Sequence, residues 1–313
     1  MGEPRLLHFG SAVVDFVYRL HELPKPGEDI IASSFRALPG GGYNMMTAAR
    51  RSGLKTAYAG LIGDGVAGAT LARALDEEDI DRLQPLYAGE DTGICITLVT
   101  DDAERTFVSR PGAECRLTCE RLAVLDTTDD DWFFTSGYTL SYPECRDEQS
   151  RFIASLPALS PFVLDPTGIV ASIPQAVLKA ALQRVDWLSC NNTEAEVIAG
   201  AGSCPDMAAR LLDAHCPRAK GVVIRAGAEG AWLACRGAPP VFVPAFKVAT
   251  VDTNGAGDCH VGAFVAALAG GRVPREAVRY ANAAAALSTT RHGGATAPTR
   301  DEVDQFLKRA GEQ

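Results

Sequence analysis

Short apolar runs that alternate with amphipathic stretches of helical period extend over most of the sequence. Four of the runs, DWFFTSG, PFVLDPTG, VDWLSCNNTE and GVVIRAG, are typical of buried strands that run into loops. Between them, residues 143–156, 173–183 and 206–214 have helical spacing. Strands of this kind are buried in parallel sheets that helices cover. The pattern therefore predicts an α/β fold with a doubly wound, mostly parallel sheet.

Two regions interrupt this alternation near the start of the chain and around its first third. SAVVDFVYRL with DIIASSFRAL, and GICITLVT with RTFVSRPG, are typical of antiparallel strands, with LPKPGED and DDAE as their turns. We expect these strands, at about 12–36 and 92–110, to form a small β-sheet lid over the ligand site. An edge extension of the main sheet without a gating role is the alternative.

The last third of the chain is predicted to be helical, over residues 255–268, 275–290 and 300–309. The sequence has no evident linker, internal repeat or low-complexity segment. A length of 313 residues is compatible with one α/β unit. We therefore expect residues 1–313 to form a single domain.

Composition excludes several classes of function. The chain has 30 Lys and Arg against 39 Asp and Glu, a net charge of −9, and no basic cluster, which argues against nucleic-acid binding. Neither a transmembrane run nor a signal-peptide core is present, so we expect a cytoplasmic protein with no membrane partner. The nine cysteines form no CxxC pair, and we expect reduced thiols.

The segment VDTNGAGDCHVGAF, residues 251–264, is the strongest chemical signal. An extended stretch runs into a glycine-broken turn and then into a helix. Glycines allow successive N–H groups to face one point, and the positive end of a helix dipole lies behind them. Gly255, Ala256, Gly257 and Asp258 are thus expected to hold a phosphoryl oxygen and its developing charge.

Asp258 would lie beside that anion site, in the first helical turn, where it could take a proton from a hydroxyl group. An ordinary Asp is a weak base, but phosphoryl transfer is largely dissociative and the proton can leave late. The alternative is an Asp that only caps the helix.

DTNGAGD resembles the C-terminal signature of the ribokinase-like carbohydrate kinases, the PfkB family, and the resemblance extends over about residues 7–300. It implies ATP-dependent phosphorylation of a hydroxyl group of a sugar or sugar-like molecule, with ATP and Mg²⁺ bound and Asp258 as general base. PGGGYNMMTAARRSG at 39–53 is similar to the family's first signature. This implies that the acceptor is held by Asp15, Gly41, Gly42 and Asn44.

On the nucleotide side, NNTEAE at 191–196 resembles the family's N-x-x-E motif, which implies that Asn191 and Glu194 organise Mg²⁺ and phosphate through water. RAGAEG at 225–230 resembles a nucleotide-side loop, but Arg225 stands where many members have Thr. The resemblance also implies nucleotide contacts from Gly227, Gly230 and Asn282, and a monovalent cation such as K⁺ at Asp252 and Asn254. His260 is a second departure from the signature, and we expect a packed side chain there.

Three alternatives remain at this point. GDGVAG at 63–68 fits a dinucleotide fingerprint, but three spaced glycines are a weak signal in a chain with 30 of them. A nucleoside kinase of the same superfamily would need an aromatic shelf for its base, and Phe16, Tyr18, Tyr43 and Phe107 are the candidates. A non-catalytic sugar sensor is the third. The sequence names neither the sugar nor the nucleoside, and exposed strand edges of a lid suggest a homodimer.

Overall fold

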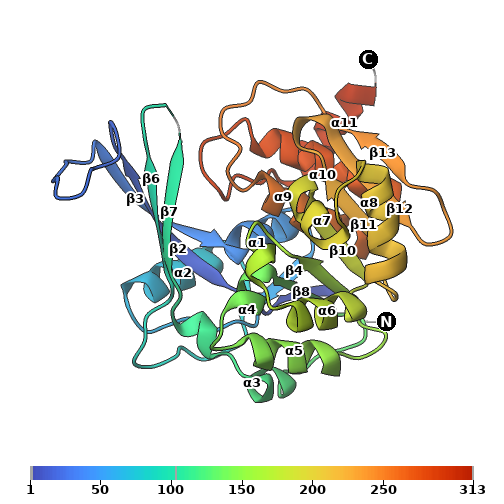
Figure 1. Cartoon of the computed structure of the whole chain (residues 1–313), viewed down its shortest axis with the longest axis horizontal. Coiled ribbons are helices and arrows are strands. Elements are labelled where there is room, and N and C mark those ends of the chain that lie inside the picture. The colour runs from blue at the N-terminus through green and yellow to red at the C-terminus, as the bar shows by residue number, and fades with distance from the viewer. Residues whose placement is uncertain (1–2, 103, 312–313) are drawn as a thin grey trace.

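A computed structural model describes residues 3–102 and 104–311 of the chain. At its centre lies a nine-stranded sheet in which β12 alone runs opposite to the other strands, so that its pairs with β11 and β13 are antiparallel (Figure 1). The predicted fold class, a mostly parallel sheet with helices and a smaller sheet, is confirmed. In spatial order the strands are β13 (Val241–Pro244), β12 (Gly230–Cys235), β11 (Gly221–Arg225), β10 (Trp187–Asn191), β9 (Phe162–Asp165), β8 (Trp132–Ser136), β1 (Arg5–His8), β4 (Lys55–Tyr58) and β5 (Asp81–Arg82).

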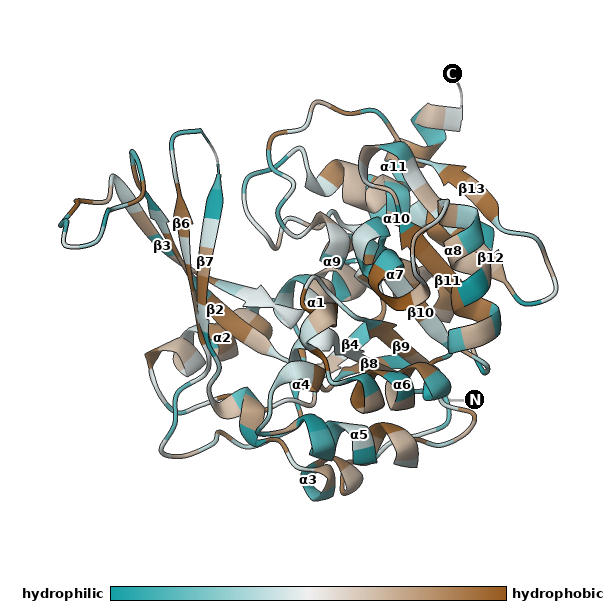
Figure 2. Cartoon of the chain, viewed as in Figure 1, coloured by the Kyte–Doolittle hydropathy of each residue, from teal (hydrophilic) through white to brown (hydrophobic). Residues whose placement is uncertain are grey.

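The strands are apolar along their length because each is buried on both faces. Alternate side chains enter different cores: Leu6 and Phe134 pack on one side of the sheet, and Leu7 and Phe133 pack on the other. Figure 2 shows hydrophobic colour along β8, β9 and β10. The four runs that the sequence indicated as buried strands are β8, β9, β10 and β11.

One face of the sheet is covered by the helices that carry the predicted phosphoryl site. α9 is apolar almost all round, which fits its position between α1 and α10. Gly262 in α9 has no room for a side chain, because a Cβ would lie 2.3 Å from the carbonyl oxygen of Met45 in α1. The helices of this face are α1 (Gly42–Arg51), α9 (Ala256–Ala269), α10 (Pro274–Ser288) and α11 (Arg300–Gly311).

The opposite face is covered by shorter helices. The helix predicted at 206–214 begins earlier, at Cys204, because Ser203 caps its first turn and Pro205 is compatible with that turn. It ends in a π-helical turn, η3 (Leu211–His215). The helices of this face are α3 (Cys119–Ala123), α4 (Gly137–Ser141), α5 (Arg146–Ser155), α6 (Gln175–Arg184), α7 (Asn192–Ala199) and α8 (Cys204–Arg210). Single turns of 3-10 helix form η1 (Ala113–Arg116), η2 (Val170–Ser172) and η4 (Gly227–Glu229).

A second sheet of four strands projects from the body beside α2 (Val66–Glu77), at the left of Figure 1. β3 continues to Gly41, beyond the expected limit near residue 36, and its last two residues, Gly40 and Gly41, pair with Val13 and Ala12 of β2. The turn expected at 101–104 includes residue 103, which lies outside the described residues. The strand order is β3 (Ser34–Gly41), β2 (Ala12–Arg19), β6 (Ile94–Val99) and β7 (Arg105–Arg110).

Two further findings bear on the expectations from composition. Within residues 3–102 and 104–311, no helix is long and apolar enough to cross a membrane. The nine cysteines all lie in these ranges, and all are free thiols.

Candidate active site

Asp258 lies in the first turn of α9, and Asn44 lies in the first turn of α1. The side-chain amide of Asn44 donates a hydrogen bond to Oδ2 of Asp258 over 3.1 Å. Asn44 is buried, and its amide oxygen has no hydrogen-bond partner within the described residues. The structure therefore joins a residue expected on the acceptor side to the expected base.

The turn before α9 has the backbone that the sequence predicted. Gly255 is left-handed, with φ +71°, and a Cβ there would lie 2.2 Å from the carbonyl oxygen of Gly294. Of the four amides expected to bind phosphate, that of Ala256 donates to the carbonyl of Thr253 over 3.2 Å. No hydrogen bond to a described residue is made by the N–H groups of Gly255, Gly257 and Asp258. Three amides, rather than four, are available at this helix start.

The electrostatic surroundings of Asp258 favour its protonated form. Burial, and next the negative charge of Asp165, raise the pKa of Asp258 to about 7, although the hydrogen bond from Asn44 and the charge of Arg225 oppose the shift. Burial also raises the pKa of Asp15 to about 6. Both carboxylates titrate near neutrality, which is the range in which a carboxylate serves best as a general base.

The residues expected to hold the acceptor lie where β2 and β3 meet the start of α1. Asp15 lies on β2 with its carboxylate against Gly40, where a Cβ would lie 2.3 Å from Oδ2. Gly41 has φ +58° and precedes the first helical residue, Gly42. A Cβ on Gly42 would lie 2.3 Å from Nε2 of His8, so the buried imidazole requires glycine there.

Arg225 is the centre of a charged cluster at the carboxyl edge of the sheet. Its guanidinium lies 3.1 Å from Oδ2 of Asp165 and 3.5 Å from Oε2 of Glu194, and it donates to Oγ of Ser189 over 2.6 Å. A Cβ on Gly257 would lie 3.8 Å from its Nε. The cation that replaces the family's Thr therefore lies beside the start of α9.

Asn191 and Glu194 form a capping box at the start of α7. Oδ1 of Asn191 accepts from the amide of Glu194 over 2.9 Å, and Oε2 of Glu194 accepts from the amide of Asn191 over 2.7 Å. Glu194 is buried, and burial, with the charge of Asp165, raises its pKa. In this structure both side chains therefore cap the start of α7.

The remaining nucleotide-side residues differ in accessibility. Gly227 is exposed, with open space around its Cα, whereas Gly230 lies against β13. Asn282 is buried: its amide donates to the carbonyls of Val243 and Pro244, and its oxygen lies 3.1 Å from Nε2 of His260. All the hydrogen-bonding groups of the Asn282 side chain are thus engaged within the protein. His260 is a packed side chain, as expected, and burial lowers its pKa to about 3.

Asp252 has a partner that the sequence did not indicate. Its Oδ1 lies 2.7 Å from Nη2 of Arg105, on β7 of the small sheet, and also accepts from the amide of Asn254 over 2.9 Å. Its Oδ2 accepts from the amide of Gly293 over 3.2 Å. Within the described part of the chain, no group of three or more His, Cys, Asp or Glu side chains could hold a metal ion.

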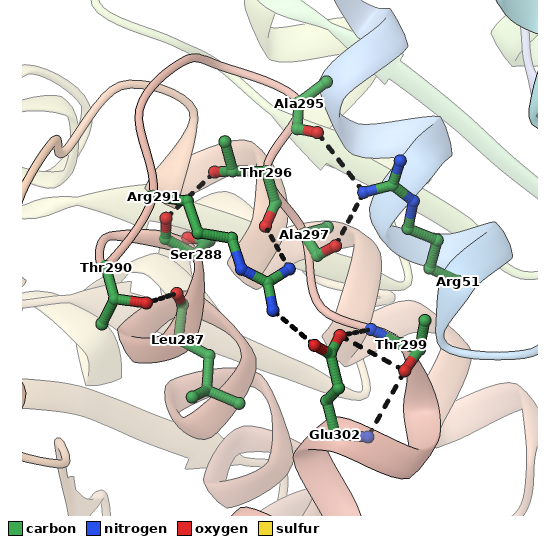
Figure 3. Close-up of polar contacts among 10 residues, drawn as sticks. All are labelled: Arg51, Leu287, Ser288, Thr290, Arg291, Ala295, Thr296, Ala297, Thr299 and Glu302. Atoms are coloured by element: carbon green, nitrogen blue, oxygen red, sulfur yellow. Dashed lines mark hydrogen bonds and ion pairs between the residues drawn. The ribbon is translucent and has the colours of Figure 1, made fainter.

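The segment that follows α10 returns to the site and is held by two arginines. Arg51 donates to the carbonyls of Ala295 and Ala297, and Arg291 pairs with Glu302 over 2.5 Å (Figure 3). The segment is thereby fixed with Gly293 against Asp252 and Gly294 against Gly255. Gly294 also lies close to Asn44, since a Cβ on it would be 3.1 Å from the amide oxygen.

The dinucleotide alternative for residues 63–68 is not supported by the contacts of this loop. At the start of α2, the amides of Ala67 and Gly68 donate to the carboxylate of Asp91 over 3.0 and 2.8 Å. A pyrophosphate would need these same amides. The side chain of Asp91 thus satisfies the helix start from within the protein.

Sequence reasoning missed several residues of the site. Ser189 belongs to no recognisable motif. Arg105 and Asp252, which contact each other, are 147 positions apart in the sequence. Gly293 and Gly294 could have been suspected only from their adjacency. Tyr138, two residues beyond β8, lies in the electrostatic field of Asp258: burial, and then this negative charge, raise its pKa. Its position after a strand, at the edge where ligands bind, was the available signal.

The doubly wound sheet, the helix start with amides free of partners among the described residues, and the buried carboxylate beside them are compatible with a kinase of small molecules. Comparison with known proteins identifies the family. The pfkB family carbohydrate kinases match residues 3–301. A sugar kinase of Escherichia coli K12, the uncharacterized YegV, is 32% identical over 94% of this chain and 91% of its own. Ribokinase of Haemophilus influenzae is 30% identical over 96% of this chain and 97% of its own.

Solved structures give the same result. Ribokinase from Thermotoga maritima, 26% identical, superposes with a TM-score of 0.83 over 97% of this chain and 99% of its own. Ribokinase from Arabidopsis thaliana, solved with ribose and ATP, is 25% identical and has a TM-score of 0.82 over 98% of this chain and 99% of its own. The chain belongs to the pfkB family of carbohydrate kinases. It is a phosphotransferase whose acceptor is a hydroxyl group.

Proposed function

We propose that this kinase transfers the γ-phosphoryl group of ATP to a hydroxyl of an uncharged sugar, with Asp258 as general base. The observation that carries the proposal is the position of Asp258. It lies between three unpaired amides at the start of α9 and the acceptor-side residue Asn44. One carboxylate oxygen is therefore held by Asn44, and the other is available to an acceptor hydroxyl.

Asp258 has the acidity that this role requires. With a pKa of about 7, it is ionised in a large part of the molecules at neutral pH and can accept a proton. The acceptor oxygen attacks the γ-phosphorus in line as the bond to the leaving ADP oxygen breaks. The hydroxyl proton moves to the Asp258 carboxylate late in this process.

Charge on the transferred group is stabilised by fixed donors. The amides of Gly255, Gly257 and Asp258 carry the positive end of the α9 dipole, and they need no reorganisation during the reaction. The Arg225 guanidinium beside Gly257 adds a full positive charge. Its ion pairs with Asp165 and Glu194 hold it in one orientation.

The acceptor is expected to be a neutral polyol. Asp15 can accept hydrogen bonds from two hydroxyls, and Gly41, Gly42 and Asn44 would hold the sugar beside it. Asp15 and Asp258 both have raised pKa values, and the charge of Arg225 opposes this shift at Asp258. A negatively charged acceptor would lie close to these two carboxylates and be repelled by them.

ATP is expected along the carboxyl edge of the sheet, where Gly227 is exposed. The placement is supported by the A. thaliana ribokinase, which binds ATP on the same fold. Glu194 retains lone pairs on both oxygens, which is compatible with a hydrated Mg²⁺ held through water by Glu194 and Asn191. Mg²⁺ would supply charge neutralisation on the phosphates. Asn282 and Gly230 would act by shaping this side of the pocket, because both are buried.

We propose that the small sheet acts as a lid and that the whole chain works as one kinase domain. Asp15, Thr97 and Phe107 lie on the same face of the small sheet, the face that carries the acceptor carboxylate. Lid closure over a bound sugar would exclude water and limit hydrolysis of ATP.

A nucleoside acceptor is less compatible with this arrangement. Phe16 and Tyr18 alternate with Asp15 along β2, so they lie on the opposite face, where their rings pack against Phe35. Tyr43 is buried, and its hydroxyl donates to the carbonyl of Ala74. Only Phe107 remains as a shelf for a base.

The outer surface of the lid supports a homodimer. Phe35 of β3 is 52% exposed and Val108 of β7 58%, and Ile31, in the connection between β2 and β3, is 97% exposed, so apolar side chains gather on this outer surface. A second copy paired along this sheet would cover them. Light scattering should return twice the mass of one chain, and Phe35→Asp should return the monomer; a wild-type monomer at micromolar concentration would remove the dimer.

The proposed reaction is tested by ADP release from ATP and Mg²⁺ over a panel of acceptors. The panel contains ribose, fructose, a 2-keto-3-deoxy sugar acid, fructose 6-phosphate, adenosine and pseudouridine. We expect turnover with a neutral sugar and much lower kcat/KM with its anionic and nucleoside counterparts. Preference for an anionic acceptor would contradict the proposed substrate class.

A further inference from the structure

The ion pair between Arg105 and Asp252 is the single one that joins the small sheet to the rest of the protein within the described ranges. Arg105 is the first residue of β7, and it pairs with Val99 on the same sheet face as Asp15. Its guanidinium reaches the loop that precedes α9. A residue of the lid thus contacts the segment that presents the phosphoryl-binding amides.

A monovalent cation does not fit at Asp252 in this arrangement. Such an ion needs oxygen ligands, whereas the groups that contact this carboxylate are N–H donors: the guanidinium of Arg105 and the amides of Asn254 and Gly293. The carbonyl of Thr289 is engaged as well, since it accepts from the amides of Val251 and Asp252. A bound cation would also lie close to the Arg105 charge and be repelled by it.

We propose that Arg105 takes the role of that cation, so that this kinase needs no monovalent cation and its phosphoryl-binding loop is completed by the lid. The inference rests on the proposed function of the same site. Arg105 acts through Asp252 and does not touch the reacting atoms, so it is a positioning residue.

The contacts beyond Asp252 explain how Arg105 would act on catalysis. Asp252 holds the amide of Asn254, directly before the left-handed Gly255, and the amide of Gly293. Gly294 packs against Gly255 and lies close to Asn44. By neutralising the Asp252 carboxylate, Arg105 would therefore stabilise both the loop before α9 and the segment at Gly293 and Gly294 that lies beside Asn44.

The kinetic test compares wild type, Arg105→Ala and Arg105→Lys in buffers of K⁺ or of tetramethylammonium at equal ionic strength. Wild-type kcat should be the same in both buffers. Arg105→Ala should lose about tenfold in kcat without K⁺, the size expected for loss of one charged hydrogen bond. Added K⁺ should restore kcat, because the vacated carboxylate can bind it, but should not restore the acceptor KM, because K⁺ does not reconnect the lid. Arg105→Lys should keep most of the wild-type kcat without K⁺.

Arg19→Ala is the matched control. Arg19 lies in the same row of the small sheet as Arg105, with Val99 between them, and its side chain has no partner within the described residues. Its kinetics should equal those of wild type in both buffers.

Thermal unfolding gives a readout that does not depend on activity. K⁺ in place of tetramethylammonium should leave the Tm of wild type unchanged and raise the Tm of Arg105→Ala. This shift tests Arg105 even if no acceptor in the panel is phosphorylated. The proposal is overturned if wild type requires K⁺ for activity, if Arg105→Ala keeps the wild-type kcat without K⁺, or if K⁺ raises neither its kcat nor its Tm.

Discussion

Asn44 donates a hydrogen bond to Asp258 over 3.1 Å, although 214 residues of sequence separate them. Each residue lies in the first turn of its helix, α1 or α9, and these helices are in direct contact at Gly262 and Met45. The acceptor-side loop and the phosphoryl-side loop are therefore fixed to each other by two packed helix starts. In the proposed reaction, this geometry brings the acceptor hydroxyl and the γ-phosphoryl group to the Asp258 carboxylate.

Asn44→Ala should raise the acceptor KM by about 10- to 100-fold, the effect expected for loss of a hydrogen bond to a charged group. It should also move the pH midpoint of kcat/KM upward, because the hydrogen bond from Asn44 lowers the pKa of Asp258. Steady-state kinetics across pH measure both effects. Tyr43→Phe is the control, since it removes a hydrogen bond of the same helix that is directed away from the site.

The kcat/KM of the wild type should fall as the pH drops below about 7, because Asp258 must be ionised to accept the proton. Its pKa is raised, so the inactive protonated form persists to a higher pH than for an ordinary Asp. The loss should be about tenfold per pH unit below the midpoint. A midpoint near the ordinary Asp value of about 4 would show that burial does not set the acidity of the base.

Gly255→Ala and Gly257→Ala should have different consequences. At Gly255 a methyl group is strained by φ +71° and lies 2.2 Å from the Gly294 carbonyl, so the free energy of unfolding should fall by about 1–3 kcal/mol. At Gly257 the nearest atom is Nε of Arg225 at 3.8 Å, so the protein should remain as stable as wild type. Activity should nevertheless fall in Gly257→Ala, because the methyl group faces the phosphoryl site. Denaturant unfolding and kcat distinguish the two, and equal stability losses would contradict this assignment.

Arg225→Met should lower kcat/KM for ATP by about 100-fold or more, because it leaves Asp165, Glu194 and Asp258 without their common cation. It should also raise the pH midpoint, since the Arg225 charge lowers the pKa of Asp258. Arg225→Lys should recover part of the loss, because a single ammonium cannot contact Ser189 and both carboxylates together. If Arg225→Met has wild-type kinetics, the charge of Arg225 is not needed for catalysis and its role is limited to packing.

Much of the fold follows from periodicity that can be read in the sequence. β8 to β11 are apolar because they are buried on both faces. The start of α9 could be predicted because a glycine turn precedes the helix. The limit of β3 was harder to predict, because Gly40 and Gly41 are typical of turns, yet their pairing with β2 continues to the start of α1.

The site could be predicted only as far as local motifs reach. Asp258, Gly255 and Asn44 belong to such motifs, whereas the pairing of Asn44 with Asp258 depends on how α1 packs on α9. The contact between Arg105 and Asp252 likewise depends on where the small sheet projects. Asn282 was expected beside the nucleotide. Its side-chain amide is instead hydrogen-bonded within the core, to His260 and to the carbonyl of Val243 on β13.

The most direct test of Asp258 as base is the rate of phosphoryl transfer in Asp258→Asn, measured in a single turnover with the best acceptor of the panel. The variant should fold. The raised pKa of Asp258 means that the folded protein loses stability as the pH rises through about 7 and this buried carboxyl ionises. Asn carries no charge, so above that pH the Tm of Asp258→Asn should be higher than that of wild type. The account predicts that transfer slows by about 10²- to 10⁴-fold while ATP and the acceptor still bind. Transfer at the wild-type rate in the folded variant would contradict it.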